Sequence, residues 1–315
     1  MSDQAPLPPA AAAGDGVAVV IPCHNEETSI AKVIADFRAA LPRARVVVVD
    51  NASSDGTAAC ARSAGAEVVS ERRRGKGYAL LRGFQQVRGA ACVVMVDGDD
   101  TYPAENAAEL VDAVQSGRVD MAIGTRLQTF STGAYPVGHN FGNRLFILLV
   151  RVFFGVRTTD LFSGYRALSG RFLELSPLIA QGFEIETELS LQALVGNFAV
   201  AEVPVHYRQR PAGSSSKLRT LRDGYRILLA LLAFFRDYRP LTFFGIVSLA
   251  FALASFVAGG VVVAEYLRTG QVLRIPLAIL SVGLLLLAAV SAIAGIVLSS
   301  ISRRAAELAA LISRR

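Results

Sequence analysis

The sequence predicts an α/β fold, an open, twisted and mostly parallel sheet flanked by helices, followed by a helix at a membrane surface and two membrane-spanning helices. Two observations predict it. Up to about residue 240, short apolar runs alternate with helical patterns, which is the order of a doubly wound sheet. Beyond that point, residues 241–264 and 275–301 contain no charged residue, and each stretch is long enough to cross a bilayer as a helix.

Five short segments are predicted to form buried parallel strands. They are nearly continuously apolar, rich in β-branched residues and too short for helices. They comprise residues 17–22, 44–50, 66–70, 92–97 and 121–126. Helical patterns lie between them, at about residues 27–40, 56–64, 77–88 and 103–115. Because open parallel sheets bind ligands beyond the carboxyl ends of their strands, the polar residues that follow each strand are the candidates for a site.

Composition divides the chain into five parts. Residues 1–16 lack the basic and apolar regions of a signal peptide and are predicted to form a disordered leader. The α/β domain is expected at 17–220, an amphipathic juxtamembrane helix at 221–239, a transmembrane hairpin at 240–302 and a basic tail at 303–315. Positive residues are dense before the first apolar span and after the second, which places both ends in the cytoplasm. The alternative is that the two apolar stretches are core helices of a large soluble protein.

Charge and motifs exclude several classes of protein. The formal net charge is +6 and the isoelectric point is near 9.5, but basic residues beside apolar spans more often meet anionic lipid heads, and no nucleic-acid-binding motif is present. No G-x-G-x-x-G follows the first strand and no Walker A pattern occurs, which argues against an NAD enzyme and a P-loop NTPase. The three cysteines lack the spacing of a disulfide framework or a zinc site, as expected in a reducing cytosol.

Four polar sets follow the predicted strands: "PCHNEE" at 22–27, "DNASSDGT" at 50–57, "ERRRGKG" at 71–77 and "DGDDTYP" at 97–103. In this order they resemble the motifs of family 2 inverting glycosyltransferases, which have the GT-A fold. Later motifs narrow the resemblance to the polyprenyl- and dolichyl-phosphate mannose or glucose synthases: "GTR", "DLFSGYRA", "FEIETEL", "RPAGSSSKL" and "YRPLTFFG". The resemblance covers residues 17–245, and the two apolar spans match the membrane-anchored branch.

The resemblance implies an enzyme that transfers a hexose from a UDP- or GDP-sugar to polyprenyl phosphate, with inversion, at the cytoplasmic face of the cell inner membrane. The leaving diphosphate gathers negative charge, which Mg²⁺ or Mn²⁺ held by carboxylates would neutralise. Asp97 and Asp99 are the expected metal ligands, with Asp99 in a surface loop and Asp100 in a turn or cap. The alternative is an Asp cap for the following helix. Some relatives have a glutamine where this chain has Thr101, which leaves the third ligand open.

The resemblance also assigns the donor nucleotide to the first three polar sets. Asp50 is expected on the base or ribose, Asn51 offers donor and acceptor contacts, and Glu26 matches a nucleotide-contacting acid. The alternatives are an Asx turn at Asp50 or Asn51 and helix-dipole stabilisation by Glu26. The glycines around Lys76 would let the backbone approach a phosphate, unless this segment is only a solvated basic loop. The expected nucleotide-binding residues are Pro22, Asn25, Glu26, Asp50, Asn51, Lys76 and Asp97.

A lipid phosphate is already ionised near neutral pH and needs cations rather than a base. The resemblance places Arg126 and Arg144 on the acceptor phosphate. Arg210 and Lys217, in "RPAGSSSKL", would close over a phosphate of the donor or the lipid. Asp160 is expected to face donor or acceptor, and the catalytic set comprises Asp99, Asp160, Arg126 and Arg144.

Two other functions stay open at this stage. In the first, the same fold transfers sugar to a hydroxyl of a glycolipid or glycan, which requires a carboxylate base such as Glu186 or Asp160. In the second, the chain is a membrane partner without catalytic turnover, although the intact D-x-D argues against this. The sequence does not fix the base, the sugar or the oligomeric state, so a homo-oligomer stays open.

Overall fold

The computed structural model describes residues 16–126, 151–152, 159–208 and 220–312. The chain forms two compact units that divide between Leu228 and Leu229. The first unit holds the α/β fold and the second holds the long apolar helices.

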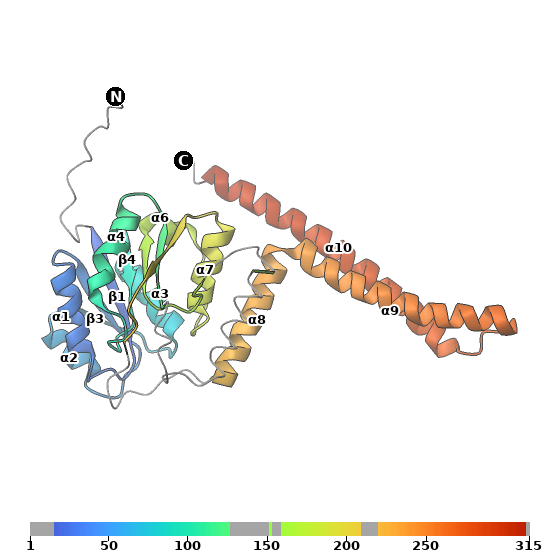
Figure 1. The fold of residues 1–315 in the computed structure, drawn as a ribbon, viewed down its shortest axis with the longest axis horizontal. Coiled ribbons are helices and arrows are strands. Elements are labelled where there is room, and N and C mark those ends of the chain that lie inside the picture. The colour runs from blue at the N-terminus through green and yellow to red at the C-terminus, as the bar shows by residue number, and fades with distance from the viewer. Residues whose placement is uncertain (1–15, 127–150, 153–158, 209–219, 313–315) are drawn as a thin grey trace, which may run out of the picture. The chain divides into compact units, whose positions relative to one another are not determined.

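The first unit is built on a sheet with the strand order β3-β2-β1-β4-β6-β5-β7 (Figure 1). The strands are β1 (Val17–Cys23), β2 (Arg45–Asp50), β3 (Glu67–Ser70), β4 (Cys92–Met95), β5 (Met121–Thr125), β6 (Arg166–Ser169) and β7 (Val200–Pro204). Strand β6 runs antiparallel between β4 and β5, and the other pairings are parallel. The parallel strands therefore end at one edge, where their polar loops gather.

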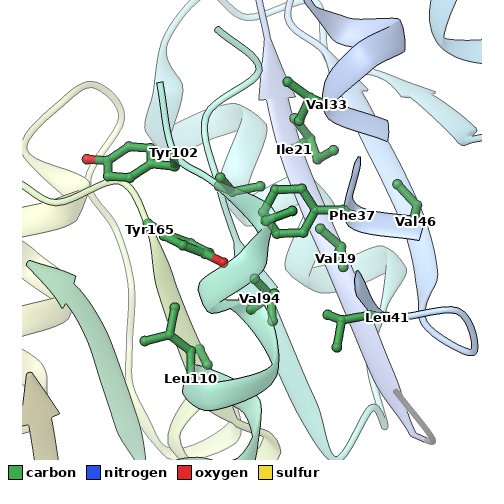
Figure 2. Close-up of a cluster of buried hydrophobic side chains, with 14 of the residues drawn as sticks. Val19, Ile21, Val33, Phe37, Leu41, Val46, Val94, Tyr102, Leu110 and Tyr165 are labelled. Atoms are coloured by element: carbon green, nitrogen blue, oxygen red, sulfur yellow. The ribbon is translucent and has the colours of Figure 1, made fainter. Parts of the chain in front are cut away.

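Alternating side chains of the strands feed two hydrophobic cores, one on each face of the sheet. Val19 and Ile21 pack with helices α1 (Ile30–Ala40) and α4 (Ala107–Gln115) in the cluster shown in Figure 2. Ala18 and Val20 pack on the other face. Their partners there come from α3 (Lys76–Gln86), α6 (Gly170–Leu175) and α7 (Ile185–Val195). The short helices α2 (Thr57–Ser63) and η1 (Ala104–Asn106) complete the unit, which is a mixed sheet between helical layers.

The fold confirms the predicted mostly parallel sheet flanked by helices, and the five expected strands all form. The element order continues beyond them with β6, α6, α7 and β7, which the sequence patterns did not specify. These elements carry the segments "DLFSGYRA" and "FEIETEL" to the carboxyl edge of β4 and β5.

The second unit contains most of α8 (Thr220–Tyr238), together with α9 (Pro240–Thr269) and α10 (Ile275–Ile312). Helices α9 and α10 pack against each other as a hairpin, and Gly270 ends α9 in the left-handed conformation at φ 71°. Ser255 Oγ donates to the carbonyl of Ser281 at 2.7 Å across the hairpin. Both helices have the length and composition to cross a membrane, and their apolar windows are only 11% and 6% buried. A helix in a soluble core would bury that surface.

Candidate active site

The loops after β1, β2 and β4 are joined by hydrogen bonds at the carboxyl edge of the sheet. Asn25 Oδ1 accepts from the Ser54 backbone N–H at 2.8 Å, and Ser29 Oγ donates to the Gly98 carbonyl at 2.7 Å. Each loop contains a non-glycine residue at positive φ: Asn25, Ala52 and Asp100. Such backbone conformations persist where surrounding contacts hold them, and they cluster at functional sites.

Four of the residues predicted to bind nucleotide lie in the loop after β1 or at the ends of β1 and β2. Pro22 is half-buried in β1, Asn25 is exposed, and Glu26 is buried with its backbone N–H donating to Thr57 Oγ1 at 2.8 Å. Asp50 ends β2 with a buried Oδ1 that has no hydrogen-bond partner in the described part of the chain. A buried carboxylate oxygen without a partner is costly, so Asp50 is suited to accept from a ligand N–H.

Asn51 differs from Asp50 because its side-chain amide is fully engaged within the protein. Its Nδ2 donates to the carbonyls of Glu71 and Arg73 at 3.2 and 2.7 Å, and its Oδ1 accepts from the Gly75 N–H at 2.8 Å. Asn51 thus holds the 71–75 loop beside Asp50, and its predicted contact with nucleotide stays a prediction.

The glycines of "RGKG" accommodate protein backbone at this place. Gly75 has φ 148°, and a Cβ there would lie 2.1 Å from the Gln181 carbonyl oxygen. A Cβ on Gly77 would lie 2.1 Å from the Ala180 carbonyl oxygen. The Gly77 N–H donates to the Gly182 carbonyl at 3.1 Å. The close approach expected for a phosphate is therefore taken here by the segment before α7, and the backbone around Lys76 is fixed.

Glu71 anchors the same loop and gives it a pH dependence. Hydrogen bonds from Arg73 lower the pKa of Glu71 from 4.5 to about 2. A carboxyl group whose pKa is lowered in the folded protein stabilises the fold at pH values above its ordinary pKa, and this stabilisation is lost as the pH falls.

We expect Glu71→Gln to lower the Tm by its full amount above pH 4.5, and the difference from wild type to disappear as the pH falls towards 2. The difference should be small, because Arg73 is exposed and solvent screens the pair. A difference unchanged across this window would contradict the assignment.

Lys76 bridges two carboxylates from distant parts of the sequence. Its Nζ lies 2.5 Å from Asp97 Oδ1 and 2.5 Å from Glu186 Oε1. Gly164 lies against this pair, since a Cβ there would be 2.5 Å from Asp97 Oδ2 and 2.9 Å from Lys76 Nζ. Burial opposes the charge on Lys76, but the Asp97 and Glu186 carboxylates outweigh it and raise the pKa of Lys76. Burial raises the pKa of Asp97 to about 6, with Asp99 and Glu186 acting in the same direction and Lys76 against it.

Asp99 is 3% exposed, so its expected position in a surface loop is wrong. It accepts from the Thr101 backbone N–H at 3.3 Å and from Thr101 Oγ1 at 2.5 Å, which orients its carboxylate. Asp100 instead pairs with Lys32 at 2.9 Å, away from the contacts of Lys76 with Asp97 and Glu186. Thr101 therefore positions Asp99.

The donor set fits a hard divalent cation that is shared with a substrate. Within the described ranges, no group of three or more His, Cys, Asp or Glu side chains could hold a metal alone. Burial raises the pKa of Asp97, and Asp99 acts in the same direction; a cation near these two carboxylates would relieve their repulsion. Mg²⁺ is commonly held by one or two carboxylates together with substrate phosphates, which is the arrangement Asp97 and Asp99 permit.

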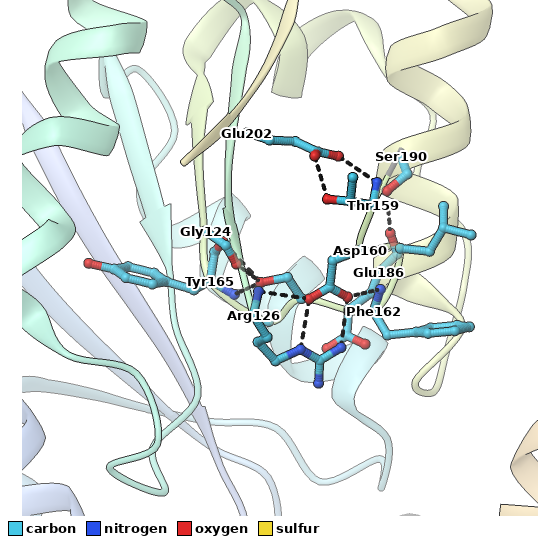
Figure 3. A network of polar contacts seen from close by, with 12 residues as sticks. Gly124, Arg126, Thr159, Asp160, Phe162, Tyr165, Glu186, Ser190 and Glu202 are labelled. Atoms are coloured by element: carbon cyan, nitrogen blue, oxygen red, sulfur yellow. Dashed lines mark hydrogen bonds and ion pairs between the residues drawn. The ribbon is translucent and has the colours of Figure 1, made fainter. Parts of the chain in front are cut away.

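A second ion pair joins Arg126, just after β5, to Asp160 (Figure 3). Arg126 Nε and Nη2 donate to the two carboxylate oxygens at 2.8 and 2.7 Å, and the Phe162 N–H donates to Asp160 Oδ1 at 3.1 Å. Tyr207 lies under the guanidinium, with its ring centroid 5.6 Å from Cζ. Burial disfavours the Asp160 carboxylate, but Arg126 outweighs it and lowers the pKa of Asp160. The Arg126 side chain is still 27% exposed, so it can meet a ligand.

Arg166 is a positioning residue that the sequence patterns missed. It is fully buried, and its guanidinium donates to the carbonyls of Ser163 and Leu161 and to Ser190 Oγ at 3.0, 2.9 and 2.8 Å. It therefore holds the turn that carries Asp160 and Gly164 against α7. The signal in the sequence that could have indicated this role is the arginine itself, which begins the short segment 166–169. Arg144, Arg210 and Lys217 lie outside the described residues, and their predicted roles stay predictions.

The fold and the paired acidic and basic groups at its carboxyl edge define a class, a GT-A glycosyltransferase. Residues 18–170 match the family described as glycosyl transferase family 2. The chain is 36% identical to glycosyltransferase AglJ of Haloferax volcanii over 75% of its own length and 77% of the relative's. It is 31% identical to polyprenol monophosphomannose synthase of Mycolicibacterium smegmatis, over 62% and 79% of the two chains. The chain belongs to glycosyl transferase family 2.

A solved structure supports the fold independently. Glucosyl-3-phosphoglycerate synthase from Mycobacterium tuberculosis, in complex with Mn²⁺, UDP-glucose and phosphoglyceric acid, superposes with a TM-score of 0.56. The match covers 70% of this chain and 79% of that one at 23% identity. At this identity the likeness concerns the fold, and it confirms the GT-A expectation.

Proposed function

We propose that this enzyme transfers a hexose from a UDP- or GDP-sugar to polyprenyl phosphate, with inversion and with the help of Mg²⁺ or Mn²⁺. The observation that carries the proposal is the pairing of both carboxylates that could act as a base for a hydroxyl acceptor. Glu186 is bound to Lys76 and Asp160 is bound to Arg126. Carboxylates held by cations make poor bases, whereas a phosphate acceptor is ionised before it arrives.

The donor nucleotide is proposed to lie over the loops after β1 and β2. The partnerless Asp50 Oδ1 would accept an N–H of the base, and Asn51 would keep the adjoining loop in place. Asn25, Pro22 and Glu26 would border the base and ribose. The M. tuberculosis structure of the same fold holds UDP-glucose with Mn²⁺, which supports a sugar nucleotide as donor.

Asp97 and Asp99 are the residues that would hold the metal, at the end of β4. The metal would neutralise the diphosphate as it leaves. The protein's own part is to orient Asp99 through Thr101 and to leave room for the Asp97 carboxylate beside Gly164. The oriented Asp99 carboxylate needs little rearrangement when charge develops.

Arg126 would bind the acceptor phosphate, with Arg144, Arg210 and Lys217 as further cations. Asp160 keeps the guanidinium aligned by a two-point contact, so the exposed part of Arg126 meets the phosphate in a fixed orientation. The similarity to polyprenol monophosphomannose synthase supports a polyprenyl phosphate as acceptor.

The apolar hairpin would anchor the catalytic unit in the cell inner membrane, with that unit in the cytoplasm. In this proposal residues 1–16 are a leader, 17–220 the catalytic domain, 221–239 a helix at the membrane surface, 240–302 the hairpin and 303–315 a basic tail. Two helices of spanning length support the anchor, and the basic residues at its two ends support the orientation.

The proposal is tested with purified full-length protein, radiolabelled UDP- and GDP-hexoses, polyprenyl phosphate, and Mg²⁺ or Mn²⁺. We expect label to enter the lipid extract from one donor, and addition of EDTA to abolish it. Label that enters no lipid with any donor of the panel would contradict the proposed function.

Cutting the chain after Tyr238 tests the anchor separately from the chemistry. We expect the shortened protein to bind metal and sugar nucleotide, because the carboxylates of the site precede the cut. Transfer to long-chain polyprenyl phosphate in vesicles should fall at least about tenfold, because local concentration at the bilayer is lost. A short water-soluble prenyl phosphate should restore part of the activity. Folded truncated protein that binds no nucleotide would show that the hairpin belongs to the site.

A further inference from the structure

The Lys76 ammonium already holds one oxygen of Asp97, a carboxylate that is assigned to the metal. Asp97 Oδ1 is held by Nζ at 2.5 Å, and Oδ2 lies against Gly164. Lys76 is itself buried, with its side chain 9% exposed, and Glu186 holds it from the other side. A divalent cation and an ammonium cannot share this carboxylate without strong repulsion. Metal binding at Asp97 therefore favours movement of Lys76 away from this carboxylate.

The backbone at Lys76 cannot make that movement, whereas the side chain can. Gly75 and Gly77 are packed against the carbonyls of Gln181 and Ala180, so the turn before α3 is fixed. The lysine side chain has four rotatable bonds and keeps its charge wherever it points. Once it leaves Asp97, the ammonium keeps Glu186 and needs a second anion in place of Asp97, and the diphosphate of the donor is the anion that arrives with the metal.

We propose that Lys76 is an internal counter-cation of the metal site, which holds Asp97 and Glu186 together in the unloaded enzyme and yields Asp97 only when metal and nucleotide diphosphate enter together. This inference rests on the proposed metal-dependent use of a sugar nucleotide. It predicts that the wild-type protein binds a divalent cation weakly alone and tightly with the nucleotide. The lysine thus makes metal loading depend on the donor.

Mn²⁺ binding to the full-length protein, measured from the electron paramagnetic resonance signal of free Mn²⁺, tests the proposal without any turnover. Without nucleotide, Lys76→Met should bind Mn²⁺ at least about tenfold more tightly than wild type, because the competing charge is gone. UDP or GDP should raise the Mn²⁺ affinity of wild type strongly and that of the variant much less. Lys32→Met is the matched control, since Lys32 pairs with Asp36 and Asp100 and leaves Asp97 untouched.

The double variant Lys76→Met/Glu186→Gln separates competition by the Lys76 ammonium from a change in the net charge of the site. Wild type has one positive and two negative charges in this cluster and the double variant has one negative charge, so the net charge is unchanged. The double variant also avoids leaving two buried carboxylates without a cation, which protects folding. It should still bind Mn²⁺ more tightly than wild type when nucleotide is absent.

Two results would overturn the proposal. If wild type binds Mn²⁺ with nucleotide but neither Lys76 variant gains affinity without it, Lys76 does not compete with the metal, and the proposed function stands. If Mn²⁺ binds in no arm, even with nucleotide, the metal dependence of the proposed function fails as well. Thermal melts of each variant confirm that the proteins compared are folded.

Discussion

Asp99→Asn is expected to lower the rate of sugar transfer at least about 100-fold, roughly 2.7 kcal/mol in the barrier, while the protein stays folded. The amide keeps the size of the carboxylate and can still accept from Thr101, so the loop is retained. It cannot supply the negative charge that a divalent cation needs. The measurement is the initial rate of label transfer to lipid at saturating Mn²⁺.

Asp100→Asn is the matched control for this effect. Asp100 is the next residue, but it pairs with Lys32 and lies 3.7 Å from Arg208 at the outer side of the loop. Its substitution should change the rate by less than about threefold, near 0.65 kcal/mol. Equal losses in the two variants would mean that the loop is merely disturbed, and activity of Asp99→Asn within threefold of wild type would refute the metal-ligand assignment.

Arg126→Ala is expected to lower kcat/KM for polyprenyl phosphate about 30-fold, because a hydrogen-bonded charge contact is worth roughly 2 kcal/mol. Nucleotide affinity should stay within about threefold, since the base and ribose are assigned to the loops after β1 and β2. Titration of UDP or GDP beside the acceptor kinetics makes the distinction. Parallel loss of nucleotide affinity and acceptor use would contradict this division of roles.

Removal of Arg126 also leaves Asp160 buried without its cation, which costs about 3–5 kcal/mol of stability. The double variant Arg126→Met/Asp160→Asn removes both charges and should recover most of that stability. It should not recover the use of polyprenyl phosphate. A double variant that transfers sugar at the wild-type rate would show that Arg126 acts only by stabilising the fold.

Strands β1, β2 and β4 could be predicted because each is an apolar run that is buried on both faces of the sheet, as at Val46–Val49 in β2. Helix α7 could not be predicted by the same means. Its residues from Ile185 to Ala193 are all buried, including Glu186 and Glu188, so no apolar stripe alternates with a polar one. Strand β6 is four residues long and begins with a buried arginine, which gives no strand pattern.

The candidate site was predictable as a set of residues and not as a set of contacts. The strand-end motifs gave Asp50, Asp97 and Asp99 because the carboxyl edge of a parallel sheet gathers such residues. The contact of Lys76 with Glu186 joins residues 110 positions apart, and the pairing of Arg126 with Asp160 spans 34. Local patterns hold no information on such pairs. The sequence therefore offered Glu186 and Asp160 as bases, while the structure gives each a cation.

Polyprenyl phosphate is the proposed acceptor, and a matched pair of lipids tests this assignment. Purified enzyme receives the same labelled donor and metal with either polyprenyl phosphate or the polyprenol of the same chain length, and label in the lipid extract is counted. We expect transfer to the phosphate to be at least about 100-fold faster than to the alcohol, because the paired carboxylates leave a hydroxyl without a base. Equal or faster transfer to the alcohol would contradict it.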